Sequence, residues 1–201
     1  MFGYYTQAEL LKIGFGSLGI NAMISRGAEL VNPANIFIGN NSRIDTFAII
    51  APSGNAVFRI GDYVQISAYT ILNGLECITL GNFSGISTHC TIITSMDNFD
   101  GNFLTNSTID KEFLGTFSAP VIISKHAAIA TGSTVLPGVH IAEGSVVGAH
   151  SLVKESTKPF TIVGGVPAKM IKERSQKLLE IEKEYLQSKT KDSLRSKKGS
   201  C

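Results

Sequence analysis

Four histidines are the side chains of this sequence best suited to moving protons near neutral pH. They are His89, His126, His140 and His150. No two of them have the spacing of a zinc site. The cysteines also lack metal-ligand spacing, and their odd number favours a reducing compartment over a disulfide framework; they are Cys77, Cys90 and Cys201. The sequence therefore predicts no metal centre.

The composition limits the folds that could position these residues. The 201 residues are enough for one domain with a sizeable core, and they include 20 glycines, no tryptophan and only 17% charged residues. This mixture argues against a disordered chain, a coiled coil or a helical bundle. A signal peptide and an apolar run of membrane-spanning length are both missing from the sequence. We therefore expect a cytoplasmic protein without membrane insertion.

Charge is divided unevenly along the chain. Residues 1–171 contain 9 Lys or Arg and 11 Asp or Glu, a net charge of −2, whereas residues 172–201 contain 9 and 5, a net charge of +4. The main body thus has no basic excess for a nucleic-acid backbone. The sequence predicts no nucleic-acid partner.

Aliphatic residues recur in steps of six along most of the chain, which neither the period of a strand nor that of a helix explains. Five trios follow this period: Ile38, Ile44 and Ile50; Ile60, Ile66 and Leu72; Leu80, Ile86 and Ile92; Ile123, Ile129 and Val135; Ile141, Val147 and Val153. Small residues stand four positions after many of them: Ser42, Ala48, Thr70, Ser84, Cys90, Ala127, Ser133, Ser145 and Ser151.

A triangular coil of three short strands accounts for this period. Every sixth side chain then points to the axis, and successive coils stack as parallel strands. The second inward position must be small because the interior is narrow, and we expect the glycines after the aliphatic residues to supply an unusual φ at the turns. Extra residues between the first three trios fall between coils, so they predict loops at one corner. The predicted fold class is an all-β solenoid.

The chain ends and one long insertion lie outside the repeat. Thr6 and Glu9 have the spacing of a capping box for a short helix that stops at Gly14, so we assign residues 1–22 to an N-terminal helix and cap. The β-helix is expected over residues 23–158, with an extended loop over 95–120. Residues 159–201 are expected to hold a turn, a helix from about 168 to 187 and a frayed tail.

Three segments resemble the hexapeptide-repeat acyltransferases, whose fold is a left-handed parallel β-helix. Residues 129–139 (IATGSTVLPGV) are similar to the family's IGAGSVILPGV coil, and residues 147–154 (VGAHSLVK) to its next coil. Residues 164–169 (GGVPAK) resemble its terminal GxPAK turn. The resemblance implies transfer of an acyl group from coenzyme A by a homotrimer with sites between subunits.

The resemblance also implies a coenzyme site. Small residues at Thr131 and Ala149 would let the pantetheine arm lie close to the backbone. Lys154, Lys169 and Lys172 would meet the phosphates, and Pro167 would pack on the adenine ring. The alternative is that Thr131 and Ala149 are plain corner residues and that Lys169 and Lys172 are solvated charges.

The family's sugar O-acetyltransferases place a catalytic histidine at the start of the long loop, in a V-x-I-x-x-x-x-H-P stretch. Aligned on Ile92, the histidine position here is Asp97 and the proline position is Asn98. A sugar hydroxyl needs a base near neutrality, whereas a neutral amine already offers a lone pair. Asp97 therefore favours an amino acceptor, which Asn98 would help to bind. Alternatively, Asp97 and Asn98 merely begin a turn.

His89 is the alternative base, if a subunit interface brings it to the site. His126 and His150 are expected at corners beside the coenzyme groove. A purely structural role is the equal alternative for both. Asp97 in place of the histidine, the segment at residues 94–101 (TSMDNFDG) and the small size without a Rossmann domain together resemble the VioB-type enzymes. These N-acetylate a dTDP-linked 4-amino-4,6-dideoxyglucose for surface polysaccharide. The resemblance therefore implies a nucleotide-linked amino sugar as acceptor and acetyl-CoA as donor. O-acetylation of a sugar or glycan, and a non-catalytic scaffold, are the alternatives.

Overall fold

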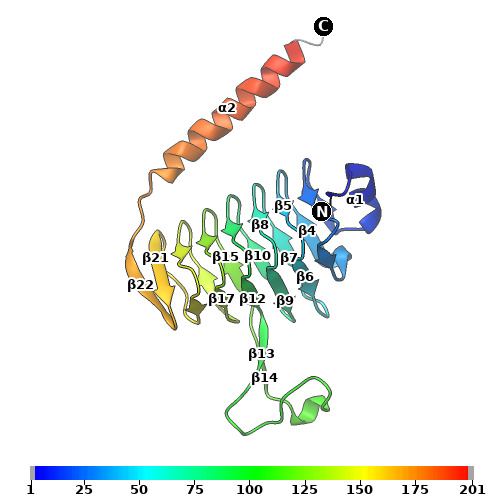
Figure 1. The fold of residues 1–201 in the computed structure, drawn as a ribbon, viewed down its shortest axis with the longest axis vertical. Coiled ribbons are helices and arrows are strands. Elements are labelled where there is room, and N and C mark those ends of the chain that lie inside the picture. Colours follow the sequence, from blue (N-terminus) through cyan, green and yellow to red (C-terminus); the bar gives the residue numbers. More distant parts are fainter. Residues whose placement is uncertain (1–2, 199–201) are drawn as a thin grey trace.

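The computed structural model describes residues 3–198, and their side chains as far as Thr190; Cys201 lies outside this part of the chain. The chain winds as a parallel β-solenoid of about seven turns with three flat faces (Figure 1). Helix α1 (Gln7–Ile13) lies at the first coil, and helix α2 (Leu178–Lys198) follows the last. The predicted all-β solenoid with a helix at each end is confirmed.

Each face is a sheet built from short strands of successive coils. Face 1 contains β1 (Ser17–Leu18), β4 (Ile36–Ile38), β7 (Phe58–Ile60), β10 (Ile78–Leu80), β15 (Val121–Ile123) and β18 (His140–Ile141). Face 2 contains β2 (Met23–Ile24), β5 (Arg43–Ile44), β8 (Gln65–Ile66), β11 (Gly85–Ile86), β16 (Ala128–Ile129), β19 (Val146–Val147), β21 (Thr161–Gly165) and β22 (Ala168–Glu173). Face 3 contains β3 (Glu29–Leu30), β6 (Ile49–Pro52), β9 (Ile71–Gly74), β12 (Thr91–Ile93), β17 (Thr134–Val135) and β20 (Leu152–Val153). Short 3-10 helices occur at η1 (Pro33–Asn35) and η2 (Lys111–Phe113).

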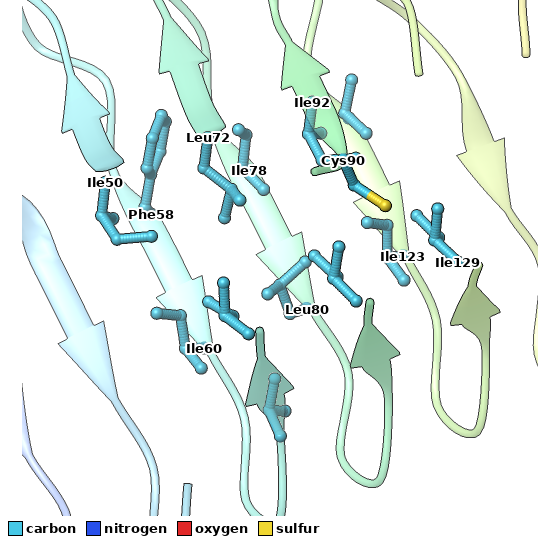
Figure 2. Close-up of a cluster of buried hydrophobic side chains, with 14 of the residues drawn as sticks. Ile50, Phe58, Ile60, Leu72, Ile78, Leu80, Cys90, Ile92, Ile123 and Ile129 are labelled. Atoms are coloured by element: carbon cyan, nitrogen blue, oxygen red, sulfur yellow. The ribbon is translucent and has the colours of Figure 1, made fainter. Parts of the chain in front are cut away.

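The ladder of aliphatic residues forms the core. All five predicted trios are buried, with no member more than 4% exposed. Register places them directly above one another, as in the pairing of Ile50 with Leu72 and of Leu80 with Ile123 (Figure 2). The small residues predicted to share the interior are buried as well. Burying each Ile or Val contributes about 1.5–3 kcal/mol, so the period of six is the main source of stability.

The expectation that the glycines after the ladder residues supply an unusual φ at the corners was wrong. Gly61 and Gly81 follow ladder residues, but neither has a positive φ. They are needed for close approach of the next coil, since a Cβ on Gly61 would lie 2.4 Å from Oδ1 of Asn82 and one on Gly81 would lie 2.5 Å from the backbone nitrogen of Lys125. Left-handed φ values occur instead at larger corner residues such as Tyr63 (+57°) and Phe83 (+60°). Their rings stack with centroids 4.7 Å apart, which offsets part of the backbone strain.

The N-terminal helix closes the first coil as expected. The backbone N–H of Glu9 donates to the hydroxyl of Thr6 (3.4 Å), and the N–H of Thr6 donates to the carboxylate of Glu9 (2.8 Å). The helix stops before Gly14, which has a φ of +82°. Leu10 is 1% exposed against the core. The predicted capping box is confirmed.

The prediction of a helix from about residue 168 was wrong for its first residues. Residues 168–173 form β22, which pairs antiparallel with β21, and the helix begins only at Leu178. It then runs to Lys198, through the residues predicted as a frayed tail; residues 199–201 lie outside the described chain. Without β22, the backbone N–H and C=O groups at the outer edge of β21 would have no hydrogen-bond partners. Strand β22 supplies those partners.

The predicted loop over residues 95–120 leaves the solenoid as an arm (Figure 1). Its stem is a hairpin in which β13 (Ser95–Asp97) pairs antiparallel with β14 (Thr116–Ser118). Within residues 3–198, no helix is long and apolar enough to cross a membrane. The same residues contain no group of three or more His, Cys, Asp or Glu side chains placed to hold a metal ion.

Candidate functional site

Two corners of the solenoid carry the residues that the sequence singled out. The 2/3 corner, between faces 2 and 3, includes residues 87–89, 130–132 and 148–150 in successive coils, and the β21–β22 turn at residues 165–167 follows them at the same edge of face 2. The 3/1 corner, between faces 3 and 1, includes residues 53–57, 74–77 and 154–155 together with the foot of the arm.

Thr131, Ala149 and Pro167 follow one another along the 2/3 corner. The backbone N–H of His150 donates to the carbonyl of Thr131 (2.8 Å), and the N–H of Gly165 donates to the hydroxyl of Ser151 (3.1 Å). The hydroxyl of Thr131 donates to the carbonyl of Thr88 (2.8 Å), so it is held inside the corner. These contacts align the three predicted pantetheine and adenine residues on one edge of the last coils.

The three predicted phosphate-binding lysines are more scattered. Lys169 stands one residue beyond the start of β22, and its ammonium lies 3.5 Å from the carboxylate of Glu155. Both side chains are about two-thirds exposed, so this ion pair is weak. Lys154 is exposed at the 3/1 corner, and Lys172 pairs with Ile162, toward the other end of the hairpin. In the register of the β21–β22 hairpin, Lys169 is closer than Lys172 to the turn at the 2/3 corner.

His89, His126 and His150 occupy corners, as predicted, but not all at one corner, whereas His140 begins strand β18. His89 and His150 lie at the 2/3 corner, both with left-handed φ values. The ring of His89 stacks on Tyr69 with centroids 4.8 Å apart, and the ring of His150 fills the space that a side chain at Gly132 would take. His126 lies instead at the corner between faces 1 and 2, where its Nε2 is 2.8 Å from Glu182. His126 therefore lies at a different corner from Thr131, Ala149 and Pro167, the residues proposed to line the coenzyme groove.

The foot of the arm is fastened by Thr94. Its hydroxyl accepts the backbone N–H of Glu76 and donates to the carbonyl of Glu76, each at 3.0 Å. Gly74 makes room for it, since a Cβ there would lie 2.0 Å from the threonine oxygen. The backbone N–H of Ala119 donates to the carbonyl of Thr94 (3.0 Å). The strands of the arm therefore leave the coil at a fixed point.

A pocket of about 530 Å³ lies at this foot. It is lined by Asp97 from β13, by further arm residues and by corner residues of the two preceding coils: Ser53, Asn73, Gly74, Leu75, Ser95, Met96, Ser107, Leu114 and Thr116. The sequence did not single out these companions of Asp97. The extra residues between the first three trios were the available signal, because they fall at this corner. We call this cavity the arm pocket.

Asp97 is half-buried at the rim of the arm pocket. Its Oδ2 accepts the backbone N–H of Asn106 (2.9 Å). Asn98 faces a second, more apolar pocket of about 680 Å³ along the arm, and both ends of its amide are hydrogen-bonded to Asp100. His89 lines neither pocket and lies at the opposite end of β12 from the arm. The structure thus separates Asp97 from His89 within one chain.

The arm is acidic, which suits a cationic group. Residues 95–118 contain four carboxylates (Asp97, Asp100, Asp110 and Glu112) and one lysine, a net charge of −3. Hydrogen bonds from the backbone and side chain of Asn102 and from Asn98 hold the pKa of Asp100 below its ordinary value, so Asp100 is ionised at neutral pH. An amine in its ammonium form would be attracted to this region.

Comparison with known proteins supports the resemblance over the whole chain. No protein-family model matches. The chain is 39% identical over 191 residues to an Escherichia coli dTDP-4-amino-4,6-dideoxy-D-glucose acyltransferase, covering 95% of this chain and 99% of the relative. It is 42% identical, with a TM-score of 0.89, to a serine-to-cysteine variant of the N-acyltransferase AntD from Bacillus cereus solved with dTDP-4-amino-4,6-dideoxyglucose and coenzyme A, covering 94% and 99% of the two chains. A maltose O-acetyltransferase from Clostridium difficile shares the fold alone, at 20% identity, a TM-score of 0.56 and coverage of 85% and 75%.

Variants of AntD solved with coenzyme A replace a serine and an aspartate that are ten positions apart in its chain. Ser87 and Asp97 are the only serine followed by an aspartate at that spacing in this sequence. Ser87 is exposed at the 2/3 corner, and the hexapeptide period does not distinguish it from other corner residues. The chain belongs to the hexapeptide-repeat β-helix acyltransferases, and within them to the acyl-CoA-dependent sugar N-acyltransferases.

Proposed function

We propose that this protein transfers an acetyl group from acetyl-CoA to the C4 amine of a dTDP-linked 4-amino-4,6-dideoxy sugar. The observation that carries the proposal is Asp97 at the rim of the arm pocket, at the histidine position of the O-acetyltransferases. The similarity to AntD and to the Escherichia coli enzyme over nearly the whole chain supports this acceptor. The wider setting proposed is surface polysaccharide synthesis in the cytoplasm.

The chemistry requires little of the protein beyond placement and proton transfer. The neutral amine attacks the thioester carbonyl, a C–N bond forms, and the C–S bond breaks with release of the coenzyme thiolate. The nitrogen loses a proton after attack, and this proton passes to the thiolate directly or through Asp97. A backbone N–H at the 2/3 corner would stabilise the oxyanion. No step needs a base as strong as one that activates a hydroxyl.

The positions of the proposed coenzyme residues and of Asp97 favour an active site that is shared between two subunits. Four of the six proposed coenzyme residues, Thr131, Ala149, Pro167 and Lys169, belong to the 2/3 corner or the hairpin beside it. Asp97 belongs to the arm at the 3/1 corner, where Lys154 also lies. A donor on one corner reaches an acceptor on the other only if two chains lie against each other. We therefore propose a homotrimer in which the arm of one subunit faces the 2/3 corner of the next.

The donor is tested with purified protein and dTDP-4-amino-4,6-dideoxyglucose. AntD was solved with 3-hydroxybutyryl-CoA, so this donor is the comparison for acetyl-CoA. Thiol release is followed with each donor at matched concentrations. We expect a higher kcat/KM with acetyl-CoA. A preference for 3-hydroxybutyryl-CoA would replace the acetyl group in the proposal while leaving N-acyl transfer intact.

A further inference from the structure

The loop at the far end of the arm holds the carboxylate of Asp97 from outside the hairpin. Asp97 ends β13, and Asn106 lies nine residues further along the chain, yet the backbone N–H of Asn106 donates to Oδ2 of Asp97 at 2.9 Å. Among the described residues, Oδ1 of Asp97 has no hydrogen-bond partner. One oxygen is therefore fixed, and the other is left for a ligand.

The backbone of Asn106 is in an unusual conformation that this contact depends on. Its φ is +87°, in the left-handed region, which asparagine tolerates better than most residues with a side chain. The side-chain Oδ1 of Asn106 accepts the backbone N–H of Thr108 (3.0 Å) and its hydroxyl. This Asx turn keeps the N–H of Asn106 directed at Asp97.

The same turn contributes a wall of the arm pocket. Ser107, between Asn106 and Thr108, lines the pocket together with Asp97. The start of the loop is tied down by the backbone N–H of Leu104, which donates to the carbonyl of Phe113 (3.0 Å). The orientation of the Asp97 carboxylate and the shape of the acceptor pocket thus depend on one short turn.

We infer that Asn106 is a positioning residue that orients the carboxylate of Asp97 toward the acceptor amine. This inference rests on the proposed function, because it assumes that Asp97 meets the amine. Asn106 touches no reacting atom; it acts through the hydrogen bond of its backbone N–H and through the turn that it closes with Thr108. Oδ1 of Asp97 then faces the ammonium or receives the proton that the nitrogen loses.

The test compares substitutions by their backbone requirements. Asn106→Val disfavours the left-handed φ and should lower kcat about tenfold, the loss expected for one charge-assisted hydrogen bond. Asn106→Gly keeps that φ and the N–H, so it should retain at least a third of the activity. The KM for acetyl-CoA should stay within twofold in both. The matched control is Asn102→Val, in the same arm, whose N–H donates to Asp100 rather than to Asp97.

A double-substitution cycle shows whether Asn106 acts through Asp97. In a protein that already carries Asp97→Asn, adding Asn106→Val should lower kcat by less than a further twofold. A further tenfold loss, or equal losses for Asn106→Val and Asn106→Gly, would overturn the inference. If Asn106→Val does not fold, Thr108→Val replaces it, with an expected threefold loss that disappears in the Asp97→Asn background. Full activity of Asp97→Asn would instead contradict the role proposed for Asp97, which is a separate failure.

Discussion

At the scale of single residues, the identity of residue 97 limits which acceptor can react. A carboxylate is a much weaker base than imidazole, so it gives little help to a hydroxyl but can hold an ammonium and accept its proton. Its Oδ2 is bound by the N–H of Asn106, which leaves Oδ1 for the acceptor. The acidic arm around it adds attraction for a cation.

Replacing Asp97 by asparagine should therefore lower kcat/KM for the amino sugar about a hundredfold near neutral pH. The loss should shrink as pH rises, because more of the acceptor amine is already neutral. The measurement is kcat/KM from pH 6 to 9, and Asp100→Asn is the control because that carboxylate is engaged within its own loop. A loss that stays constant with pH would show that Asp97 has only a structural role.

At the scale of elements, helix α2 is anchored to the corner between faces 1 and 2. Tyr185 packs edge-on against Tyr63 with centroids 5.7 Å apart, and the carboxylate of Glu182 lies 2.7 Å from Lys125 and 2.8 Å from His126. Burial raises the pKa of Glu182, but the hydrogen bonds and charges of Lys125 and His126 outweigh it, and the pKa lies below its ordinary value of 4.5.

A lowered pKa of Glu182 gives the docking of α2 a pH dependence of definite sign. The contribution of the ionised carboxylate is fully present above pH 4.5, and it is lost as the pH falls through the lower pKa of the docked state. Hydrogen exchange of the α2 amides should accelerate in that range relative to the β-helix. Glu182→Gln should remove this transition. An unchanged transition in that variant would assign it to another group.

At the scale of the whole molecule, most of the proposed coenzyme residues lie on a different corner from Asp97, so activity should depend on assembly. Asp97→Asn removes the carboxylate proposed to meet the acceptor amine. Ala149→Tyr should block the 2/3 corner, where the coenzyme is proposed to bind. Alone, Asp97→Asn should keep only about a hundredth of wild-type activity, as argued above, and Ala149→Tyr should be inactive. Co-expression at equal levels should restore about a quarter of wild-type activity, because each site combines one corner and one arm at random. No recovery in mixed oligomers would indicate that each chain contains a complete site.

Those parts of the fold that rest on local chemistry could be predicted from the sequence. The ladder from Ile38 to Val153 follows from a strict period and a narrow interior, and the helix at Thr6 follows from its cap. The strand over residues 168–173 could not be predicted, because it forms only to satisfy the edge of β21. Asp97 could be found from its place after Ile92, but the contact with Asn106 depends on a turn that closes across nine residues.

The most direct test of amine chemistry uses two acceptors that differ in one group. Purified protein is incubated with acetyl-CoA and either dTDP-4-amino-4,6-dideoxyglucose or its 4-hydroxy counterpart, dTDP-6-deoxyglucose, and the products are identified by mass spectrometry and by their resistance to mild base. We expect a base-stable amide from the amino sugar and no ester from the hydroxyl sugar. A base-labile ester from the hydroxyl sugar, with no product from the amino sugar, would contradict N-acyl transfer.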